Sequence, residues 1–273
     1  MNFAFPLLHN RYELSFRDET MFDRYLLIQI ITFVVAVSGL ELWERNRPGF
    51  VINKNKCLLL NFTAMLIVIF FGEYAKKIVT VGYNTIHLSS ALAGNWLSSL
   101  PSIPKMFLAV VFADFCLYWV HRAMHGPLRI LWKTHSFHHT IGELWWMAGS
   151  RTSFFHLLLF ALPQVFIGFY LLRLTAGEAA AVLCFSTVVN LWLHINVWVN
   201  IGPLDWLVIT PNHHRLHHGA KGLMRSNLAF VFTVWDRMFG TYANPLTVGK
   251  NVDVFQVDVP ARSGGLIRMM AGI

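Results

Sequence analysis

The sequence predicts an all-α, polytopic membrane helical bundle of four or five spans, with a histidine-rich helical cap on the cytoplasmic side. Three observations support this fold class. Of 273 residues, 55% are hydrophobic and only 13% are charged, with a mean hydropathy of +0.50, whereas soluble domains carry about 25% charged residues. Five apolar runs have roughly the length that crosses a bilayer. Ten of the 13 histidines fall into four groups, most of them near the ends of these runs.

The first half of the chain holds three of the apolar runs. Two of them cover roughly residues 25–43 and 57–71, and a basic loop joins them. The second run is short, since about 20 residues are needed to span the hydrocarbon. Residues 73–105 are mixed in character and end near two prolines, so we expect interfacial helix and loop there. The third span is expected over roughly 106–120 and leads directly into the first histidines.

The second half alternates polar and apolar segments. A polar, histidine-rich stretch covers about 121–153, where Trp145, Trp146 and Met147 are expected to form an interfacial aromatic belt rather than a substrate gate. The fourth span is expected over roughly 154–172, with a kink at Pro163, and the fifth over roughly 179–199. Residues after Pro211 are polar enough to be expected outside the bilayer.

No linker divides the chain, so a single membrane-embedded domain is expected over residues 1–273, with a motif-bearing core at 114–242. The net charge of +8 is typical of basic cytoplasmic loops. If the 45–56 loop is cytoplasmic, 15 Lys and Arg residues lie inside and 7 outside, as the positive-inside rule expects. No basic run is interleaved with aromatic residues in the manner of a nucleic-acid-binding protein, so no nucleic-acid partner is expected.

The first histidine group is His121 and His125, preceded by Asp114. At 100° per residue these three positions fall within about 40° of one another on a helix. The two histidines are therefore placed to bind one metal ion together. Asp114 is expected to accept a ring N–H and fix a histidine tautomer. The alternative is a polar helix end at the membrane interface.

Three further groups follow. His135, His138 and His139 have the H-x-x-H-H spacing, which places three imidazoles on one face of a helix. The same spacing recurs in the last group, whose extra member His213 is interpreted as structural or as a neighbour of the ligands. Its three spaced members are His214, His217 and His218. One isolated histidine, His194, lies between the two H-x-x-H-H groups.

About nine clustered imidazoles are too many for one metal ion, but they suit two ions with open positions. Asn190, one turn before His194, is placed to hold a metal-bound water. The chain lacks the Glu-x-x-His motif of soluble diiron proteins and the H-E-x-x-H motif of zinc proteases. Two rival readings remain open: a histidine-rich membrane metal transporter, and a b-type haem electron carrier with paired axial histidines.

At these residues the chain resembles the fatty acid hydroxylase/sterol desaturase superfamily, whose signature is H-x-x-x-H, H-x-x-H-H, an isolated histidine and a final H-x-x-H-H. The resemblance runs from about Asp114 to Tyr242. The stretches L-W-L-H at 191–194, N-I-G-P-L at 200–204 and P-N-H-H-R-L-H-H-G at 211–219 are most similar to the alkylglycerol monooxygenase branch. It implies a cytoplasmic, histidine-ligated diiron centre that hydroxylates or desaturates a lipid with O₂.

Residue by residue, the resemblance implies nine metal ligands: His121, His125, His135, His138, His139, His194, His214, His217 and His218. Asn190 and Asp114 are expected to be catalytic. Arg122, Arg151 and Asp236 are expected to pin the ligand-bearing segments, with lipid headgroup contact as the alternative for the arginines.

Electrons are expected from an external donor. The chain contains no GxGxxG or C-x-x-C-H sequence, so neither a nucleotide site nor a c-type haem is expected. A ferredoxin or a cytochrome b5-like protein would supply the electrons, and Lys133 and Arg215 are expected to dock such an acidic partner.

Overall fold

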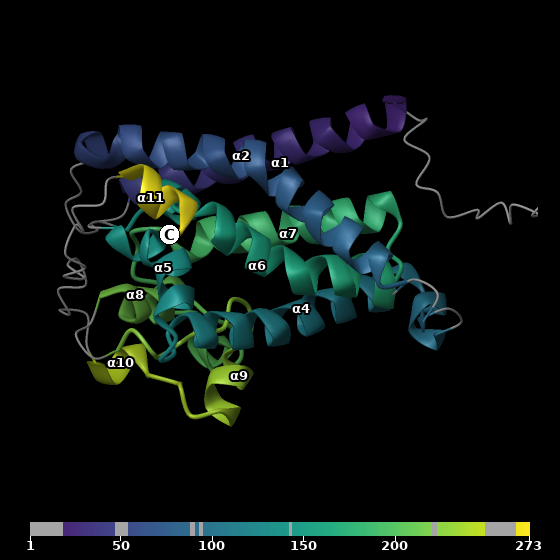
Figure 1. The fold of residues 1–273 in the computed structure, drawn as a ribbon. Coiled ribbons are helices and arrows are strands. Elements are labelled where there is room, and N and C mark those ends of the chain that lie inside the picture. Colours follow the sequence, from purple (N-terminus) through teal and green to yellow (C-terminus); the bar gives the residue numbers. More distant parts are fainter. Residues whose placement is uncertain are drawn as a thin grey trace, which may run out of the picture.

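The structure is a computed structural model that describes residues 19–46, 54–87, 91–92, 95–141, 144–219, 223–248 and 266–273. Five long helical segments run side by side along one direction (Figure 1). They are α1 (Glu19–Asn46), α2 (Lys54–Thr85), α4 (Ser102–Met124), α6 (Phe154–Val165) with its π-helical continuation η4 (Phe166–Leu171), and α7 (Ala176–Leu193).

Short helices gather mainly at the end of the bundle where α4 finishes (Figure 1). These are α5 (Arg129–Ser136), η2 (His138–Thr140), η3 (Trp146–Ser150), η5 (Gly202–Trp206), α8 (Pro211–Gly219), α9 (Thr233–Met238), α10 (Pro245–Val248) and α11 (Leu266–Ala271), whereas η1 (Trp96–Ser99) lies before α4. Among the described residues the only β pairing is one isolated antiparallel bridge, Val208–Phe232.

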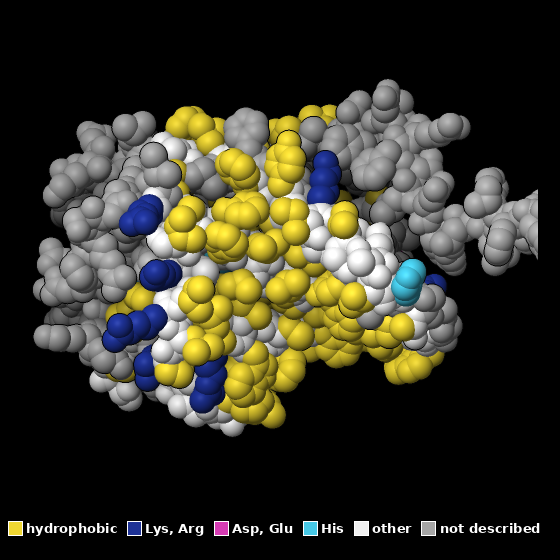
Figure 2. Space-filling model, in the orientation of Figure 1, with side chains coloured by type: hydrophobic (Ala, Val, Ile, Leu, Met, Phe, Trp, Pro, Cys, Tyr) yellow, Lys and Arg dark blue, Asp and Glu magenta, His cyan; other side chains and the backbone are white. Residues whose placement is uncertain are grey.

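The chain is an integral membrane protein built as a helical bundle, as the sequence predicts. Within the described residues, three helices are long and apolar enough to cross a membrane: Ser102–Met124, Phe154–Leu171 and Ala176–Leu193. A shorter apolar stretch covers Ile30–Trp43 of α1. Basic side chains gather at the end that carries α5, α8 and α10, beside a broad hydrophobic belt (Figure 2). The count of four or five spans stays a prediction.

Two expectations about helix boundaries were wrong. The segment 73–105 was expected to be interfacial helix and loop, but its first part, 73–85, is the second half of the long helix α2, because Ala75 and Val79 pack into a buried cluster with α6 and η4. The Tyr170 hydroxyl also donates to the Asn84 side chain at 2.7 Å. The fifth span was predicted to reach residue 199, but α7 ends at Leu193 with His194 as its C-cap.

The irregularity expected at Pro163 takes a specific form. Proline has no backbone N–H and cannot complete the helical ladder. Three residues after it the helix widens into the π turn η4, and the Leu172 N–H donates to the Ile167 carbonyl at 2.9 Å. The Leu162 carbonyl accepts a hydrogen bond from the Tyr83 hydroxyl at 2.9 Å. The neighbouring helix α2 therefore supplies a polar partner beside the proline.

The expected aromatic belt at Trp145 and Trp146 was also wrong. Their exposed fractions are 3% and 8%, and both belong to a core cluster that packs η3 against α1 and α7. The indole N–H of Trp146 donates to the Glu41 carboxylate of α1 at 2.8 Å. The polar atom that would anchor an interfacial tryptophan in the headgroup layer is here bonded inside the bundle.

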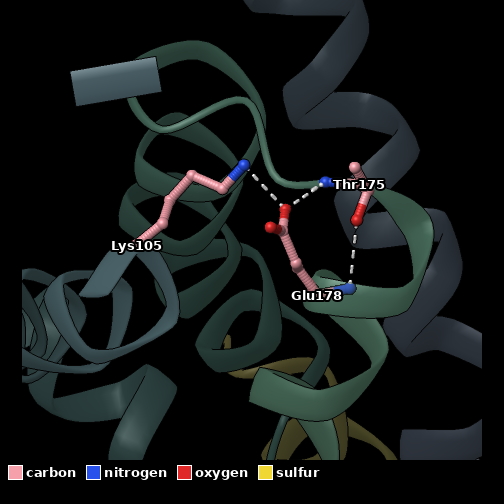
Figure 3. A network of polar contacts seen from close by, with 3 residues as sticks. All are labelled: Lys105, Thr175 and Glu178. Atoms are coloured by element: carbon pink, nitrogen blue, oxygen red, sulfur yellow. Dashed lines mark hydrogen bonds and ion pairs between the residues drawn. The ribbon is translucent and has the colours of Figure 1, made fainter. Parts of the chain in front are cut away.

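At the opposite end of the bundle, α4 and α7 begin beside one another, and an ion pair joins them (Figure 3). Lys105 Nζ lies 2.9 Å from the Glu178 carboxylate, and both side chains are buried. Thr175 and Glu178 form a capping box: the Thr175 side chain accepts from the Glu178 N–H, and the Glu178 side chain accepts from the Thr175 N–H. The carboxylate thus starts α7 and fixes α4 against it.

We expect Lys105→Met to destabilise the protein, because it leaves the Glu178 carboxylate buried with no cation. Exposed pairs contribute about 0–1 kcal/mol and deeply buried ones about 3–5 kcal/mol, so a pair at a helix end should lose about 1–3 kcal/mol. Thermal unfolding in detergent measures this. The double variant Lys105→Met/Glu178→Met should recover part of the loss; a double loss equal to the sum of the losses in Lys105→Met and Glu178→Met would show that the pair is not coupled.

Candidate metal centre

The nine histidines predicted as ligands come together in two groups beside the end of α4. The first group is His121, His125, His135, His139 and His217; the second is His138, His194, His214 and His218. In each group the candidate ligand nitrogens lie within 4.8 Å of one another. The groups touch, because the rings of His139 and His218 stack with centroids 4.7 Å apart. All nine side chains are buried.

The two H-x-x-H-H motifs are each shared between the groups. His135 lies on α5 and His139 on the 3₁₀ turn η2, and both face the first group, whereas His138 faces the second. The expectation that 135, 138 and 139 share one helical face was therefore wrong, because α5 ends at Ser136. On α8 the division is reversed: His214 and His218 face the second group and His217 the first.

Backbone carbonyls orient several of the rings. His121 Nδ1 lies 2.7 Å from the Leu228 carbonyl, His138 Nδ1 2.9 Å from that of Arg151, and His194 Nδ1 2.7 Å from that of Asn190. His217 Nδ1 lies 3.1 Å from the Ser226 carbonyl. A carbonyl only accepts, so each Nδ1 carries the proton and each neutral ring has a bare Nε2.

These bare nitrogens face one another. The Nε2 atoms of His138 and His194 are 3.4 Å apart, although neither carries a hydrogen to share. His217 Nε2 is buried and has no hydrogen-bond partner among the described residues. Lone pairs held this close repel each other unless a cation lies among them. The donor set therefore fits metal ions with imidazole ligands.

Burial also keeps the rings in the form that binds metal. It holds the pKa of His139 and of His218 well below the usual 6.5, and the neighbouring imidazoles lower both further. Desolvation by burial also lowers the pKa of His194, to about 4. At neutral pH these side chains are uncharged, and only the neutral imidazole offers a lone pair to a metal.

Asp114 does not orient a histidine, contrary to the sequence-based expectation. Its Oδ1 accepts the N–H groups of Phe230 and Val231 at 2.9 and 3.0 Å, and its Oδ2 accepts that of Phe232 at 2.9 Å. The indole N–H of Trp235 donates to Oδ2 at 3.0 Å. The carboxylate therefore binds the 230–235 segment to α4. Its link to the site is indirect, through Leu228, which orients His121.

The polar residues expected to pin the ligand segments make such contacts. Asp236 accepts the N–H of Leu228 at 2.7 Å and that of Ala229 at 3.1 Å. Arg151 is 2% exposed and donates to the Thr140 carbonyl at 2.6 Å and to the side chain of Asn61. Burial at this level excludes lipid headgroup contact for Arg151.

The sequence assigned a role to each of two further arginines, Arg122 and Arg215, and the structure agrees only with the role of Arg122. Arg122 donates to the Tyr118 hydroxyl at 2.7 Å and to the Phe239 carbonyl at 2.9 Å, so it ties α4 to α9. Arg215 was expected to dock an electron donor, and this was wrong. Its side chain is 0% exposed and donates to Asn196 Oδ1 at 2.8 Å. Lys133 remains exposed on α5.

Two other histidines lie close by. His156, at the start of α6, is buried, places Nδ1 3.3 Å from His135 Nδ1 and packs against Phe160. Sequence reasoning passed over it because it stands alone at the start of an apolar run. His213 belongs to neither group: its Nδ1 accepts from the Thr210 N–H at 3.2 Å, at the start of α8. This agrees with its interpretation as structural.

Asn190 and Gly149 shape the surroundings of His194. The Asn190 amide lies 3.4 Å from the Gly149 carbonyl, while its main-chain carbonyl accepts from His194. A Cβ at Gly149 would lie 2.7 Å from His194 Nδ1, so only glycine leaves room for the ring. A direct role of Asn190 in catalysis stays a prediction.

One opening reaches the first group from outside. A cavity of about 380 Å³ is lined by His125 together with Met124, Gly126, Arg129, Trp132, Met224 and Arg225. The two arginines are exposed. The cavity therefore reaches His125 of the first group from the end of the molecule where basic side chains gather (Figure 2).

The fatty acid hydroxylase family model matches residues 106–241, which contain both histidine groups. Ornithine lipid hydroxylase OlsE of Rhizobium tropici is 30% identical over 236 residues, which are 82% of this chain and 69% of the relative. The chain belongs to the fatty acid hydroxylase family. The predicted resemblance is thereby confirmed.

Other members of the family are also similar. Alkylglycerol monooxygenase of Xenopus tropicalis is 33% identical over 140 residues, 50% of this chain and 30% of the relative. A Delta(7)-sterol 5(6)-desaturase of Aspergillus fumigatus is 30% identical over 148 residues, 53% of this chain and 39% of the relative. The chain thus spans less than half the length of these two proteins. No solved structure matches it with significant similarity.

We expect Asp114→Ala to lower the melting temperature in detergent strongly, because three backbone N–H groups lose their acceptor. Each buried, unsatisfied group costs about 1–3 kcal/mol. Asp114→Asn retains one acceptor oxygen and should lie between. Thr187→Ala is the matched control, since that hydroxyl binds only its own helix, at Leu183. Equal melting temperatures for Asp114→Ala and Thr187→Ala would contradict the anchoring role.

Proposed function

We propose that this protein is an O₂-dependent lipid hydroxylase or desaturase whose two histidine groups each hold one iron ion. The observation that carries the proposal is the pair of bare Nε2 atoms of His138 and His194, which face one another at 3.4 Å. Bound there, iron would supply O₂ activation and the oxidation of a C–H bond. Iron rather than zinc is proposed because the reaction class of the relatives requires redox chemistry.

The protein's own residues would hold and align this centre. His121, His125, His135, His139 and His217 would bind one ion, and His138, His194, His214 and His218 the other. The carbonyls of Leu228, Arg151 and Asn190 keep the proton on Nδ1, so that Nε2 is directed at the metal. Asn190 is proposed to hold a water at the second ion, through the side-chain amide that lies near His194.

The substrate is proposed to be a membrane lipid. The named relatives act on ornithine lipid, alkylglycerol and a sterol, all largely apolar molecules with a polar end. The bundle has a hydrophobic belt that adjoins the histidine end (Figure 2). Among these, hydroxylation of an amphiphilic bacterial-type lipid is favoured, because the ornithine lipid hydroxylase matches 82% of this chain.

The two rival functions fit the site less well. An axially ligated haem needs two histidines on opposite faces of a macrocycle. Here, rings from five histidines crowd one group, and several Nε2 pairs are 3.0–3.2 Å apart, such as His121 with His135. This spacing leaves no room for a porphyrin. A metal transporter needs polar residues along its spans, whereas the three described spans have a mean hydropathy of 1.5 to 1.9.

Electrons are proposed to come from a ferredoxin or a cytochrome b5-like protein on the cytoplasmic side. The basic end of the molecule supports this orientation (Figure 2). Arg129 and Arg225 flank the opening to His125, and Lys133 is exposed on α5 nearby. An acidic carrier docked there would lie close to the first histidine group, which shortens the path for electron transfer.

Metal analysis of detergent-purified protein, expressed with added iron, tests the proposal. We expect about two irons per chain in the natural sequence, one for each histidine group. His217→Ala should lower iron at the first group and His138→Ala at the second, because each loses a ligand nitrogen. His213→Ala is the matched control: it is a buried histidine of the same α8 motif that belongs to neither group.

The same preparations should be given O₂, a reduced ferredoxin and a bacterial lipid extract. A product heavier by one oxygen, or lighter by two hydrogens, is expected by mass spectrometry and should be lost in His217→Ala. Iron that is absent from folded protein, or that is equally low in His213→Ala and His217→Ala, would sink the diiron proposal. Full iron with no oxidised lipid would instead contradict the substrate class.

Docking of the donor gives a separate prediction. Arg129→Gln and Arg225→Gln should raise the KM for an acidic donor several-fold and leave kcat nearly unchanged, because surface charges act mainly on encounter. The effect should shrink at high salt. Lys77→Gln, an exposed cation on α2 away from the opening, is the control. Equal KM values in all three variants would place the docking surface elsewhere.

A further inference from the structure

The segment that packs on the middle of α4 is apolar on its outer surface. It consists of η5 with the following turn (202–209) and of the loop before α9 together with α9 itself (228–238), and we call it the ledge. Four of its large side chains are strongly exposed: Leu204 at 58%, Trp206 at 62%, Leu207 at 42% and Met238 at 64%. The sequence alone placed all residues after Pro211 in water.

The ledge is attached at a defined depth. Asp114, which accepts the N–H groups of residues 230–232, lies ten residues before the end of α4 at Met124. At 1.5 Å per residue this is about 15 Å inside that end of the helix. The hydrocarbon of a bilayer is about 30 Å thick, close to the length of α4. A span over Ser102–Met124 would place a segment bound at Asp114 at a level where α4 itself is surrounded by lipid.

Aromatic contacts hold the ledge along the same stretch of α4. The rings of Phe115 and Trp235 are 5.0 Å apart, and those of Trp119 and Phe239 are 4.8 Å apart. Trp119 is 42% exposed, so the outer surface of α4 continues onto α9. The space-filling view shows hydrophobic side chains over both elements (Figure 2).

The ledge also satisfies its own backbone, as a segment in lipid must. The Thr233 N–H donates to the Leu207 carbonyl and the Ile209 N–H to the Val231 carbonyl, both at 2.9 Å. The Asp114 carboxylate accepts the three N–H groups of residues 230–232. A carboxylate in the middle of a span is costly unless polar groups surround it, and here it supplies the acceptors that this non-helical backbone lacks.

One charged residue on the ledge has the behaviour of an interfacial anchor. The Arg237 guanidinium lies 5.1 Å from the Trp206 ring centroid and 3.7 Å from that of Tyr242. Arginine and tryptophan together are typical of the boundary between lipid tails and headgroups.

We propose that the ledge is a re-entrant membrane segment whose outer face contacts the acyl chains of the leaflet nearest the metal centre. Trp206, Leu207 and Met238 enter the lipid, and Arg237, whose Nε donates to the Trp206 carbonyl at 3.1 Å, lies on the headgroup side of the ledge. The ledge runs directly into α8, which carries four histidines. Lipid contact thus fixes the height of the metal centre above the bilayer. This proposal is independent of what the histidines bind.

Spin-label accessibility in phospholipid nanodiscs tests the depth of the ledge. Single cysteines are introduced as Trp206→Cys and Met238→Cys into a chain carrying Cys57→Ala, Cys116→Ala and Cys184→Ala, and are labelled with a nitroxide. Collision with O₂, which concentrates in lipid, is compared with collision with water-soluble chromium oxalate. Phe185→Cys, 44% exposed near the middle of α7, is the lipid reference. Leu246→Cys, 60% exposed on α10, is the water reference.

The labels at 206 and 238 are expected to collide frequently with O₂, as the label at 185 does, and rarely with chromium oxalate. If both labels behave like the one at 246, the ledge is in water and the proposal is overturned. Two sites are labelled in case one of the variants does not fold. A single gel-filtration peak would verify that a variant is folded. Iron content does not enter the readout, so this test and that of the diiron centre fail separately.

Discussion

The structure depends on two groups of imidazole nitrogens that face one another inside the protein. Nε2 atoms of neighbouring histidines lie 3.0–3.4 Å apart in both groups, and at least His138 and His194 have no proton to share between them. Without a cation, such an arrangement brings lone pairs together in a place where water does not compensate. The surrounding contacts hold the rings in this position: carbonyls of Leu228 and Arg151 fix tautomers, and Asp236 in turn fixes the loop at Leu228.

The gathering of these histidines into one candidate metal site could be predicted from the sequence, but its division into two groups could not. Spacing pointed to eight of the nine histidines, because imidazoles three and four residues apart fall on one side of a helix, and the isolated His194 came from the family resemblance. The division depends on where α5 ends. A break after Ser136 turns His138 away from His135 and His139. Local patterns do not show such a break, since tertiary contacts such as that from His138 to Arg151 decide it.

The misjudged residues share one physical cause: each has a partner far away in the sequence. Trp146 looked interfacial, but it binds Glu41, 105 residues earlier. Asp114 looked like a partner for a histidine on its own helix, but its acceptors are taken by N–H groups more than 110 residues later. Arg215 looked exposed from its charge, yet Asn196 binds it inside the core. The presence of long apolar helices was easier to predict than their ends, because apolar length is a property of the local sequence alone.

The groups that hydrogen-bond to Nδ1 of the histidines determine how much negative charge lies beside the candidate metal site. Many metal-binding histidines donate their second N–H to a carboxylate, which adds negative charge beside the ion. Here the four partners identified for His121, His138, His194 and His217 are uncharged carbonyls. The nearest buried carboxylates, Asp114 and Asp236, accept backbone N–H groups instead. Neutral ligands with neutral partners would leave the positive charge of bound ions almost undiminished, which would favour anions at the open positions. A family built on carboxylate ligands would lose this property, so the choice of histidine is itself part of the chemistry.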